Sequence, residues 1–162
     1  MEEKKVPYHV GIIMDGNRRW ATSNGLKKSE GHKEGYNTIK EISKYIYKEG
    51  VKVLSIFAFS TDNFKRDDDE VTSLMNLFIK GFNELKKTYN EDNIKLIFSG
   101  RREPLRKDVL KSMDEIVEST KNNTGGILNI CINYGGQAEI VDTTKKLIEK
   151  VQSKELNIED IT

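Results

Sequence analysis

The sequence has little of what marks secreted, membrane-spanning or nucleic-acid-binding proteins. Its single cysteine, Cys131, cannot form an internal disulfide and fits a reducing compartment. No run approaches the ~18 consecutive apolar residues of a membrane-spanning helix, and the N-terminal MEEKKVPYH does not resemble a signal peptide. Lysine plus arginine (27) nearly balance aspartate plus glutamate (26), so no overall charge favours nucleic acid. We therefore expect a cytoplasmic protein with at most peripheral membrane contact and no nucleic-acid partner.

Linker-like segments rich in proline, glycine or serine are also missing, and the 162 residues predict one domain. Four short apolar runs predict strands, at residues 8–14, 52–59, 94–99 and 127–134. These runs are continuous rather than alternating, which is typical of strands buried on both faces. Apolar residues at helical spacing predict helices at residues 32–48, 69–86 and 105–120, and a fourth around 140–151. The alternation predicts an α/β fold, an open parallel sheet flanked by helices.

The helix expected from Asp69 to about Lys86 has more apolar surface than one buried face requires. Its expected core stripe consists of Val71, Leu74, Met75, Phe78, Phe82 and Leu85. Leu77 and Ile79 widen the apolar surface beyond that stripe. Two interpretations stay open: a fully buried helix, or a helix with one face on the sheet and another lining a cavity for a long hydrocarbon.

The first predicted strand ends abruptly in a group of polar residues: Asp15, Gly16, Asn17, Arg18, Arg19 and Trp20. Open α/β sheets bind ligands at the carboxyl ends of their strands. Glycine allows close approach of the backbone, the next helix offers N–H groups to an anion, and arginines match phosphate oxygens. A carboxylate beside a phosphate makes sense when a divalent cation bridges the two. The segment predicts a metal–diphosphate site with an indole wall; an ordinary turn with exposed charges is the alternative.

The string YHVGIIMDGNRRWA (residues 8–21) closely resembles the signature of the cis-prenyltransferases, the undecaprenyl diphosphate synthase family. Three further blocks are similar to other motifs of that family: GHKEG (31–35), AFSTDNFKR (58–66) and LNICINYGG (128–136). Each block falls at the carboxyl end of a predicted strand or near the start of a predicted helix. That placement is what a shared ligand site requires.

The resemblance implies a Mg²⁺-dependent enzyme that condenses isopentenyl diphosphate with an allylic diphosphate such as farnesyl diphosphate, forming a cis double bond at each step. The implied product is a polyprenyl diphosphate of the undecaprenyl type, held in a hydrophobic tunnel between sheet and helices. It also implies a homodimer when full length and work at the membrane surface. Family members continue with further strands, an arginine-rich block for isopentenyl diphosphate and a later glutamate for Mg²⁺. We therefore expect residues 1–162 to form a single cis-prenyltransferase-like domain, truncated after the helix start at Asn157.

By resemblance, Asp15 coordinates Mg²⁺ and assists departure of the diphosphate, and Asn63 serves the proton-removal step. Since an amide is a poor base, Asn63 is expected to orient a water or a phosphate oxygen that takes the proton. His32 is expected to open a helix and reach phosphate. The full set of expected substrate-binding residues is Gly16, Asn17, Arg18, Arg19, Trp20, Lys28, His32, Ser60, Thr61, Asp62, Phe64 and Arg66.

Several positions depart from the family pattern or stay ambiguous. Lys28 stands where an arginine is frequent, and Phe64 where a tryptophan is frequent. The acidic run at residues 67–70 resembles a metal cluster, but we interpret it as a helix N-terminus that favours negative charge. Two other functions stay open: a non-catalytic subunit or fragment that binds only allylic diphosphate, and an unrelated nucleotide-binding domain. The missing GxGxxG and GxxxxGK[ST] motifs weaken the latter.

Overall fold

The computed structural model describes residues 5–162. Its strands are β1 (His9–Ile13), β2 (Val53–Ser60), β3 (Ile94–Ser99) and β4 (Gly126–Tyr134). Its α-helices are α1 (Asn17–Ser23), α2 (Lys28–Lys48), α3 (Asp68–Glu91), α4 (Lys107–Thr120) and α5 (Gly136–Gln152). Two short 3-10 helices are η1 (Thr61–Lys65) and η2 (Ile158–Asp160). The predicted strands and helices are confirmed, with shifts at their ends.

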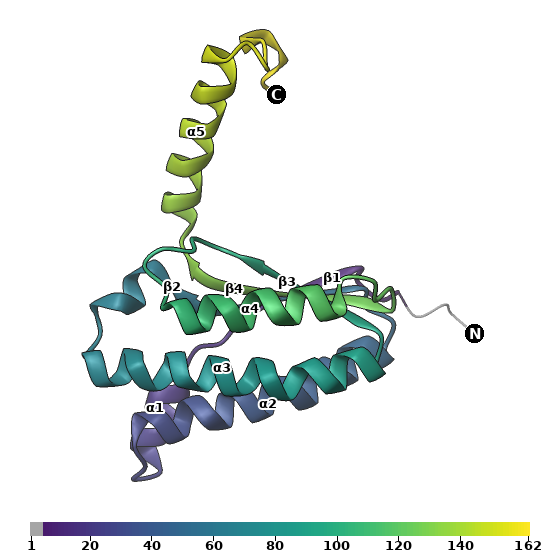
Figure 1. The fold of residues 1–162 in the computed structure, drawn as a ribbon. Coiled ribbons are helices and arrows are strands. Elements are labelled where there is room, and N and C mark those ends of the chain that lie inside the picture. Colours follow the sequence, from purple (N-terminus) through teal and green to yellow (C-terminus); the bar gives the residue numbers. More distant parts are fainter. Residues whose placement is uncertain (1–4) are drawn as a thin grey trace.

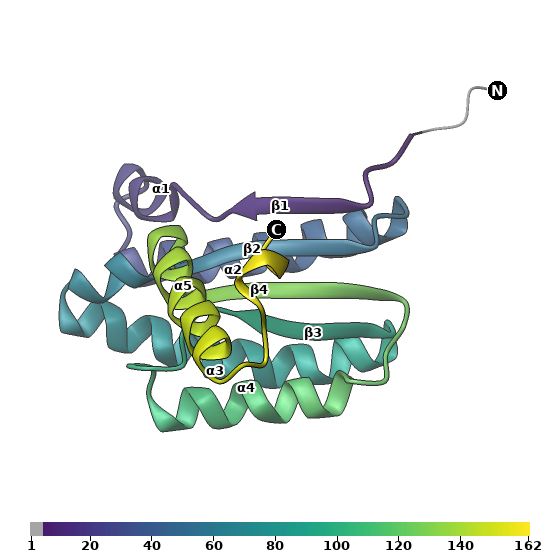
Figure 2. The same cartoon turned by 90° about the horizontal axis from the view of Figure 1, so that it is seen from above.

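All strand pairs are parallel, and the four strands lie in the order β1-β2-β4-β3. Helices α2 and α3 cover one face, while α4 lies along the edge strand β3 and packs against α3 (Figure 1). Helix α5 projects from the opposite face (Figure 1) and lies in front of the sheet when seen from above (Figure 2). It contains no buried residue. The α/β fold with an open parallel sheet is therefore confirmed. Within residues 5–162, no helix is long and apolar enough to cross a bilayer.

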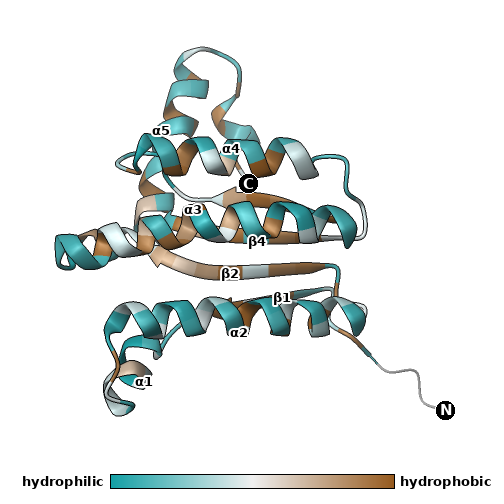
Figure 3. Ribbon diagram, turned by 60° about the horizontal axis from the view of Figure 1, so that its bottom comes forward, coloured by the Kyte–Doolittle hydropathy of each residue, from teal (hydrophilic) through white to brown (hydrophobic). Residues whose placement is uncertain are grey.

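Burial along the strands alternates, which differs from the expected burial on both faces. In β2, Leu54 and Ile56 are buried by α3 and the neighbouring strands, whereas Ser55 and Phe57 on the other face are only half-buried. Figure 3 shows that β2 is nonetheless largely apolar along its length. The apolar runs thus identified the strands but not the number of covered faces, because the described helices pack mainly on one side.

A buried threonine joins α4 to the edge of the sheet. Thr120 is fully buried, and its hydroxyl accepts a hydrogen bond from the Leu96 backbone N–H (3.1 Å) while donating one to the Ile116 carbonyl (2.8 Å). Thr120→Val keeps the shape but leaves that N–H without its acceptor, and we expect a loss of about 1–3 kcal/mol in the free energy of unfolding by urea titration. Thr144 makes the same bond to the carbonyl four residues earlier on exposed α5. Thr144→Val should change stability by less than about 0.5 kcal/mol, and an equal loss in both variants would contradict this account.

Candidate active site

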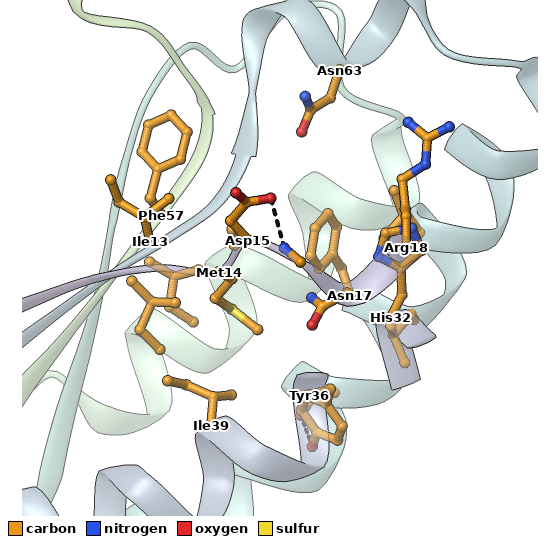
Figure 4. A pocket seen from close by; sticks show the side chains of 18 of the residues that line it. Ile13, Met14, Asp15, Asn17, Arg18, His32, Tyr36, Ile39, Phe57 and Asn63 are labelled. Carbon is orange, nitrogen blue, oxygen red and sulfur yellow. Dashed lines mark hydrogen bonds between the residues drawn. The ribbon is translucent and has the colours of Figure 1, made fainter. Parts of the chain in front are cut away.

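A cavity of about 790 Å³ opens at the carboxyl ends of β1 and β2 and runs between the sheet and helices α2 and α3. Its mouth is polar, and its lining there comprises Asp15, Asn17, Arg18, Arg19, Lys28, His32, Ser60, Asn63 and Arg66. Its depth is apolar, lined chiefly by Ile39, Ile56, Leu74, Leu77, Phe78, Phe82, Leu85, Leu128 and Ile130. Figure 4 shows Asp15, Arg18 and Asn63 near the mouth, with Tyr36 and Ile39 further in. The expected tunnel between sheet and helices is therefore present.

The two extra apolar residues of α3 have different positions. Leu77 lines the cavity, as the second interpretation of this helix predicts. Ile79 packs against the core and faces a shallow surface depression near Arg106 instead. Most of the core stripe itself also lines the cavity, so one continuous apolar surface of α3 faces both the sheet and the cavity, and Leu77 extends it.

The turn after β1 holds a carboxylate at the cavity mouth. Gly16 has φ of +88°, a left-handed conformation that residues with side chains adopt at a cost. Its N–H donates to Asp15 Oδ1 (2.6 Å), and Arg19 Nη2 donates to Asp15 Oδ2 (3.1 Å). These two bonds lower the pKa of Asp15 below its usual value, so the exposed group is ionised at neutral pH.

Helix α1 begins directly after this turn and is seated on α2 through two glycines. A Cβ atom at Gly31 would lie 2.2 Å from the Asn17 carbonyl oxygen, and one at Gly35 would lie 2.5 Å from the Asn17 side-chain nitrogen. The GHKEG block therefore presents its two glycines, one helical turn apart, to the first residue of α1. The similarity to a family motif drew attention to this block. Only the structure shows that its glycines allow the close approach of α1.

Four basic side chains of the mouth surround one carboxylate that the sequence analysis did not select. Glu70 Oε1 accepts hydrogen bonds from Arg66 Nη1 (3.1 Å) and His32 Nε2 (3.2 Å). Arg18 Nε lies 3.6 Å from the same oxygen, and Lys28 Nζ lies 3.5 Å from Oε2. The acidic run does begin α3, as expected, with Asp68 and Asp69 exposed in the first turn. The side chain of Glu70, in contrast, is largely buried. Its place in a run of acidic residues gave no sign of this in the sequence.

His32 lies in the second turn of α2 and does not open the helix, because α2 begins at Lys28. Its ring still lines the cavity and is largely buried. Burial lowers the pKa of His32, and Glu70 offsets this only in part. The pKa of Glu70 also lies below its usual value: burial raises it, but His32, Arg18 and Arg66 together outweigh that effect.

The lowered pKa of His32 predicts a pH dependence of stability. Unfolded His32 takes up a proton near pH 6.5, but the folded protein resists protonation until lower pH, so the unfolded state holds more protons in between. The free energy of unfolding should therefore fall as the pH drops below about 6.5. Urea titrations between pH 7.5 and 5.5 should show this slope in the wild type and in His9→Gln, which removes an exposed histidine, but a smaller slope in His32→Gln. An unchanged slope in His32→Gln would contradict the assignment.

Four expected site residues do not line this cavity: Trp20, Thr61, Asp62 and Phe64. Trp20 is 45% exposed on α1. Phe64 packs edge-on against Phe59 with 4.9 Å between ring centroids, and Asp62 pairs with Lys65 at the surface. Their roles with substrate stay predictions. Asn63 does line the cavity, and its side-chain oxygen accepts a hydrogen bond from the Ser60 N–H (3.2 Å).

The described residues could bind a metal through one carboxylate, and they do not form a complete set of metal ligands. Among residues 5–162, no three histidine, cysteine or carboxylate side chains come close enough to hold a metal together. Asp15 is an ionised, accessible carboxylate at the mouth of the cavity. Mg²⁺ commonly binds through one or two carboxylates, with waters and substrate phosphates completing its shell. Asp15 is therefore suited to hold Mg²⁺ jointly with a diphosphate.

The protein is an open α/β protein whose site, at the carboxyl ends of the parallel strands, joins a cationic rim to an apolar cavity. Residues 13–162 match the model of the family described as "Putative undecaprenyl diphosphate synthase", and the chain belongs to this family. Proteins of this prenyltransferase type are generally metal-dependent. The resemblance to the cis-prenyltransferases is thus confirmed.

Individual relatives agree with the family. An "Isoprenyl transferase" of Fusobacterium nucleatum is 43% identical over 91% of this chain and 64% of its own length. A "Ditrans,polycis-undecaprenyl-diphosphate synthase ((2E,6E)-farnesyl-diphosphate specific)" of Legionella pneumophila is 41% identical over 97% of this chain and 66% of its own length. The crystal structure of lavandulyl diphosphate synthase from Lavandula x intermedia, in complex with dimethylallyl diphosphate, has a TM-score of 0.92 and 30% identity, covering 96% of this chain and 66% of that one. The chain spans 64% of the first of these relatives' length and 66% of the other two.

Proposed function

We propose that the chain binds an allylic diphosphate for cis-prenyl transfer, with farnesyl diphosphate as the primer and isopentenyl diphosphate as the second substrate. The observation that carries this proposal is a cavity that joins a cationic mouth to an apolar depth. Such a cavity matches a molecule with a charged head and a long hydrocarbon tail. The names of the relatives support the same substrate class, since one is farnesyl-diphosphate specific and another was crystallised with dimethylallyl diphosphate.

The mouth supplies groups for the allylic diphosphate and for proton removal. Arg18, Arg19 and Lys28 present charge-assisted donors to the diphosphate. Mg²⁺ held at Asp15 would neutralise the charge that develops as the diphosphate leaves the allylic carbon. Asn63, fixed by its bond to the Ser60 backbone, orients the water or phosphate oxygen that takes the proton from the new bond. The tail lies along α3, where the apolar wall excludes water.

We further propose that residues 1–162 act as one cis-prenyltransferase-like domain, that the full-length protein is a homodimer, and that the product has an undecaprenyl-type chain. A cytoplasmic protein that touches the membrane peripherally fits a lipid product, and the relatives' names support the product class. A second candidate function is binding of allylic diphosphate without transfer. Its support is the same cavity, because a cationic mouth and an apolar depth account for binding without a second substrate site.

Two assays separate these functions. Calorimetric titration with farnesyl diphosphate and with farnesol tests the cavity, and Mg²⁺-dependent incorporation of labelled isopentenyl diphosphate onto farnesyl diphosphate tests transfer. We expect farnesyl diphosphate to bind far more tightly than farnesol, ATP or other nucleotides. Binding together with extractable long-chain product supports the transferase, and binding without product supports the second candidate. Preference for a nucleotide would overturn both.

A further inference from the structure

The side chain of Glu70 is almost completely buried, with 7% of its surface exposed. An ionised carboxylate at such a position requires compensation, because burial alone disfavours its charge. The compensation comes from the four basic side chains that approach within 3.6 Å, from α1, α2 and the segment between η1 and α3. Glu70 therefore joins three parts of the chain that are separate in sequence.

Glu70 stands behind the cavity wall rather than in it. Arg18, Lys28, His32 and Arg66 all line the cavity, whereas Glu70 does not. The basic side chains lie between the carboxylate and the space that a ligand would occupy. Glu70 is thus placed to hold these side chains from outside the cavity lining.

The bonding pattern leaves donors free on the cavity side. Arg66 uses Nη1 on Glu70, and Arg18 approaches Glu70 with Nε. A guanidinium carries five N–H donors in a rigid fork, so both arginines keep donors for a second acceptor. Oε2 of Glu70 has no hydrogen bond, and Lys28 Nζ at 3.5 Å is its electrostatic partner. Lys28 Nζ also lies 3.7 Å from Asp67 Oδ2. Glu70 is therefore the shared partner of the other three basic side chains, and it holds Lys28 together with Asp67.

We propose that Glu70 is a positioning residue for the diphosphate site: its charge holds Arg18, Lys28, His32 and Arg66 in the arrangement that binds phosphate oxygens. This inference rests on the proposed function, since it assumes that the mouth binds a diphosphate. Removing the negative charge of Glu70 makes the site more positive overall. It should nonetheless weaken anion binding, because the basic side chains then repel one another and lose their common acceptor.

The test is binding of inorganic diphosphate and of farnesyl diphosphate to the full chain, measured by calorimetry at low ionic strength. We expect Glu70→Gln, which has nearly the same shape, to weaken binding by about 10- to 100-fold, as loss of an outer-shell partner does at metal sites. Asp69→Asn removes the same charge from the same turn of α3, at an exposed position, and should bind like wild type. Glu70→Asp returns the charge on a shorter stem and should recover part of the lost affinity.

A second readout separates positioning from general destabilisation. The sequence contains two histidines, so the His32 imidazole can be followed by NMR beside His9. Glu70 raises the pKa of His32 against the effect of burial. The His32 titration should therefore move to lower pH in Glu70→Gln and stay in place in Asp69→Asn, with both proteins folded.

The outcomes of these measurements are distinguishable. Weaker binding in Glu70→Gln, normal binding in Asp69→Asn and partial recovery in Glu70→Asp support the inference. Binding of farnesyl diphosphate that is unchanged or tighter in Glu70→Gln overturns this inference and leaves the proposed function standing. Failure of Glu70→Asp to recover any affinity while its His32 titration returns to the wild-type position shows that charge is not the property that matters. A wild-type chain that binds neither ligand removes the proposed function, and this inference with it.

Discussion

Alanine at Gly31 should lower the free energy of unfolding by about 3 kcal/mol or more, the upper range for overpacking a well-filled contact. A Cβ atom there would lie 2.2 Å from the Asn17 carbonyl oxygen and 2.9 Å from the Ala21 methyl group. The first of these is a backbone atom, so no side-chain rotation relieves the clash. Helix α1 must move away from α2 as a unit. Urea titration followed by circular dichroism measures the loss.

Two other glycines make this prediction specific. Alanine at Gly35 meets only the end of the Asn17 side chain, at 2.5 Å, which can rotate away. Gly35→Ala should therefore cost less stability than Gly31→Ala but displace the Asn17 amide from the cavity and weaken diphosphate binding. A Cβ atom added at Gly136, the first residue of α5, would meet no atom within 4 Å, and Gly136→Ala should be neutral or stabilising by up to about 1 kcal/mol. Equal losses in all three variants would show that glycine matters at these sites for a reason other than contact.

The sequence predicted the sheet and most helices because apolar runs and helical spacing are local signals. Strand Ile94–Ser99 agrees at both ends with its apolar run, since turns flank it on both sides. The start of α2 was missed by four residues because the polar residues Lys28 to Gly31 carry no apolar periodicity. The segment is helical because Glu30 bonds back to the Lys27 N–H (2.9 Å) and α1 packs on Gly31, and the second of these contacts is not local.

The location of the candidate site was predictable because its motifs lie at the carboxyl ends of predicted strands. Asp15, Asn17 and Asn63 were placed correctly at the mouth by this rule. Glu70 was not, because its neighbours in sequence are exposed acids and its partners on α1 and α2 lie 38 or more residues away along the chain. Trp20 was expected at the wall, but in the described structure it does not line the cavity and is 45% exposed. The direction of a side chain on a short helix depends on packing that the motif does not encode.

Asp15→Ala should abolish the effect of Mg²⁺ on ligand binding. Without metal, the Asp15 carboxylate repels a diphosphate at the mouth, and it also engages Arg19 at 3.1 Å. Its removal frees Arg19 and should leave metal-free binding of farnesyl diphosphate unchanged or tighter. With Mg²⁺, wild type should gain affinity by tenfold or more, because metal shared between a carboxylate and phosphates is worth at least ~1.4 kcal/mol. The variant should gain almost none.

Paired titrations with and without Mg²⁺ measure this difference, with Asp114→Ala as the control. Asp114 is also an exposed carboxylate paired with an arginine, Arg102 at 2.8 Å, but it lies on α4 away from the cavity. It should keep the wild-type response to Mg²⁺. Where transfer is measurable, Asp15→Ala should lower it by about 100- to 1,000-fold or more, the effect of removing one charge-stabilising group. A variant that keeps the full gain from Mg²⁺ would show that the metal is held without Asp15, and the only carboxylate lining the described cavity would then have no part in binding it.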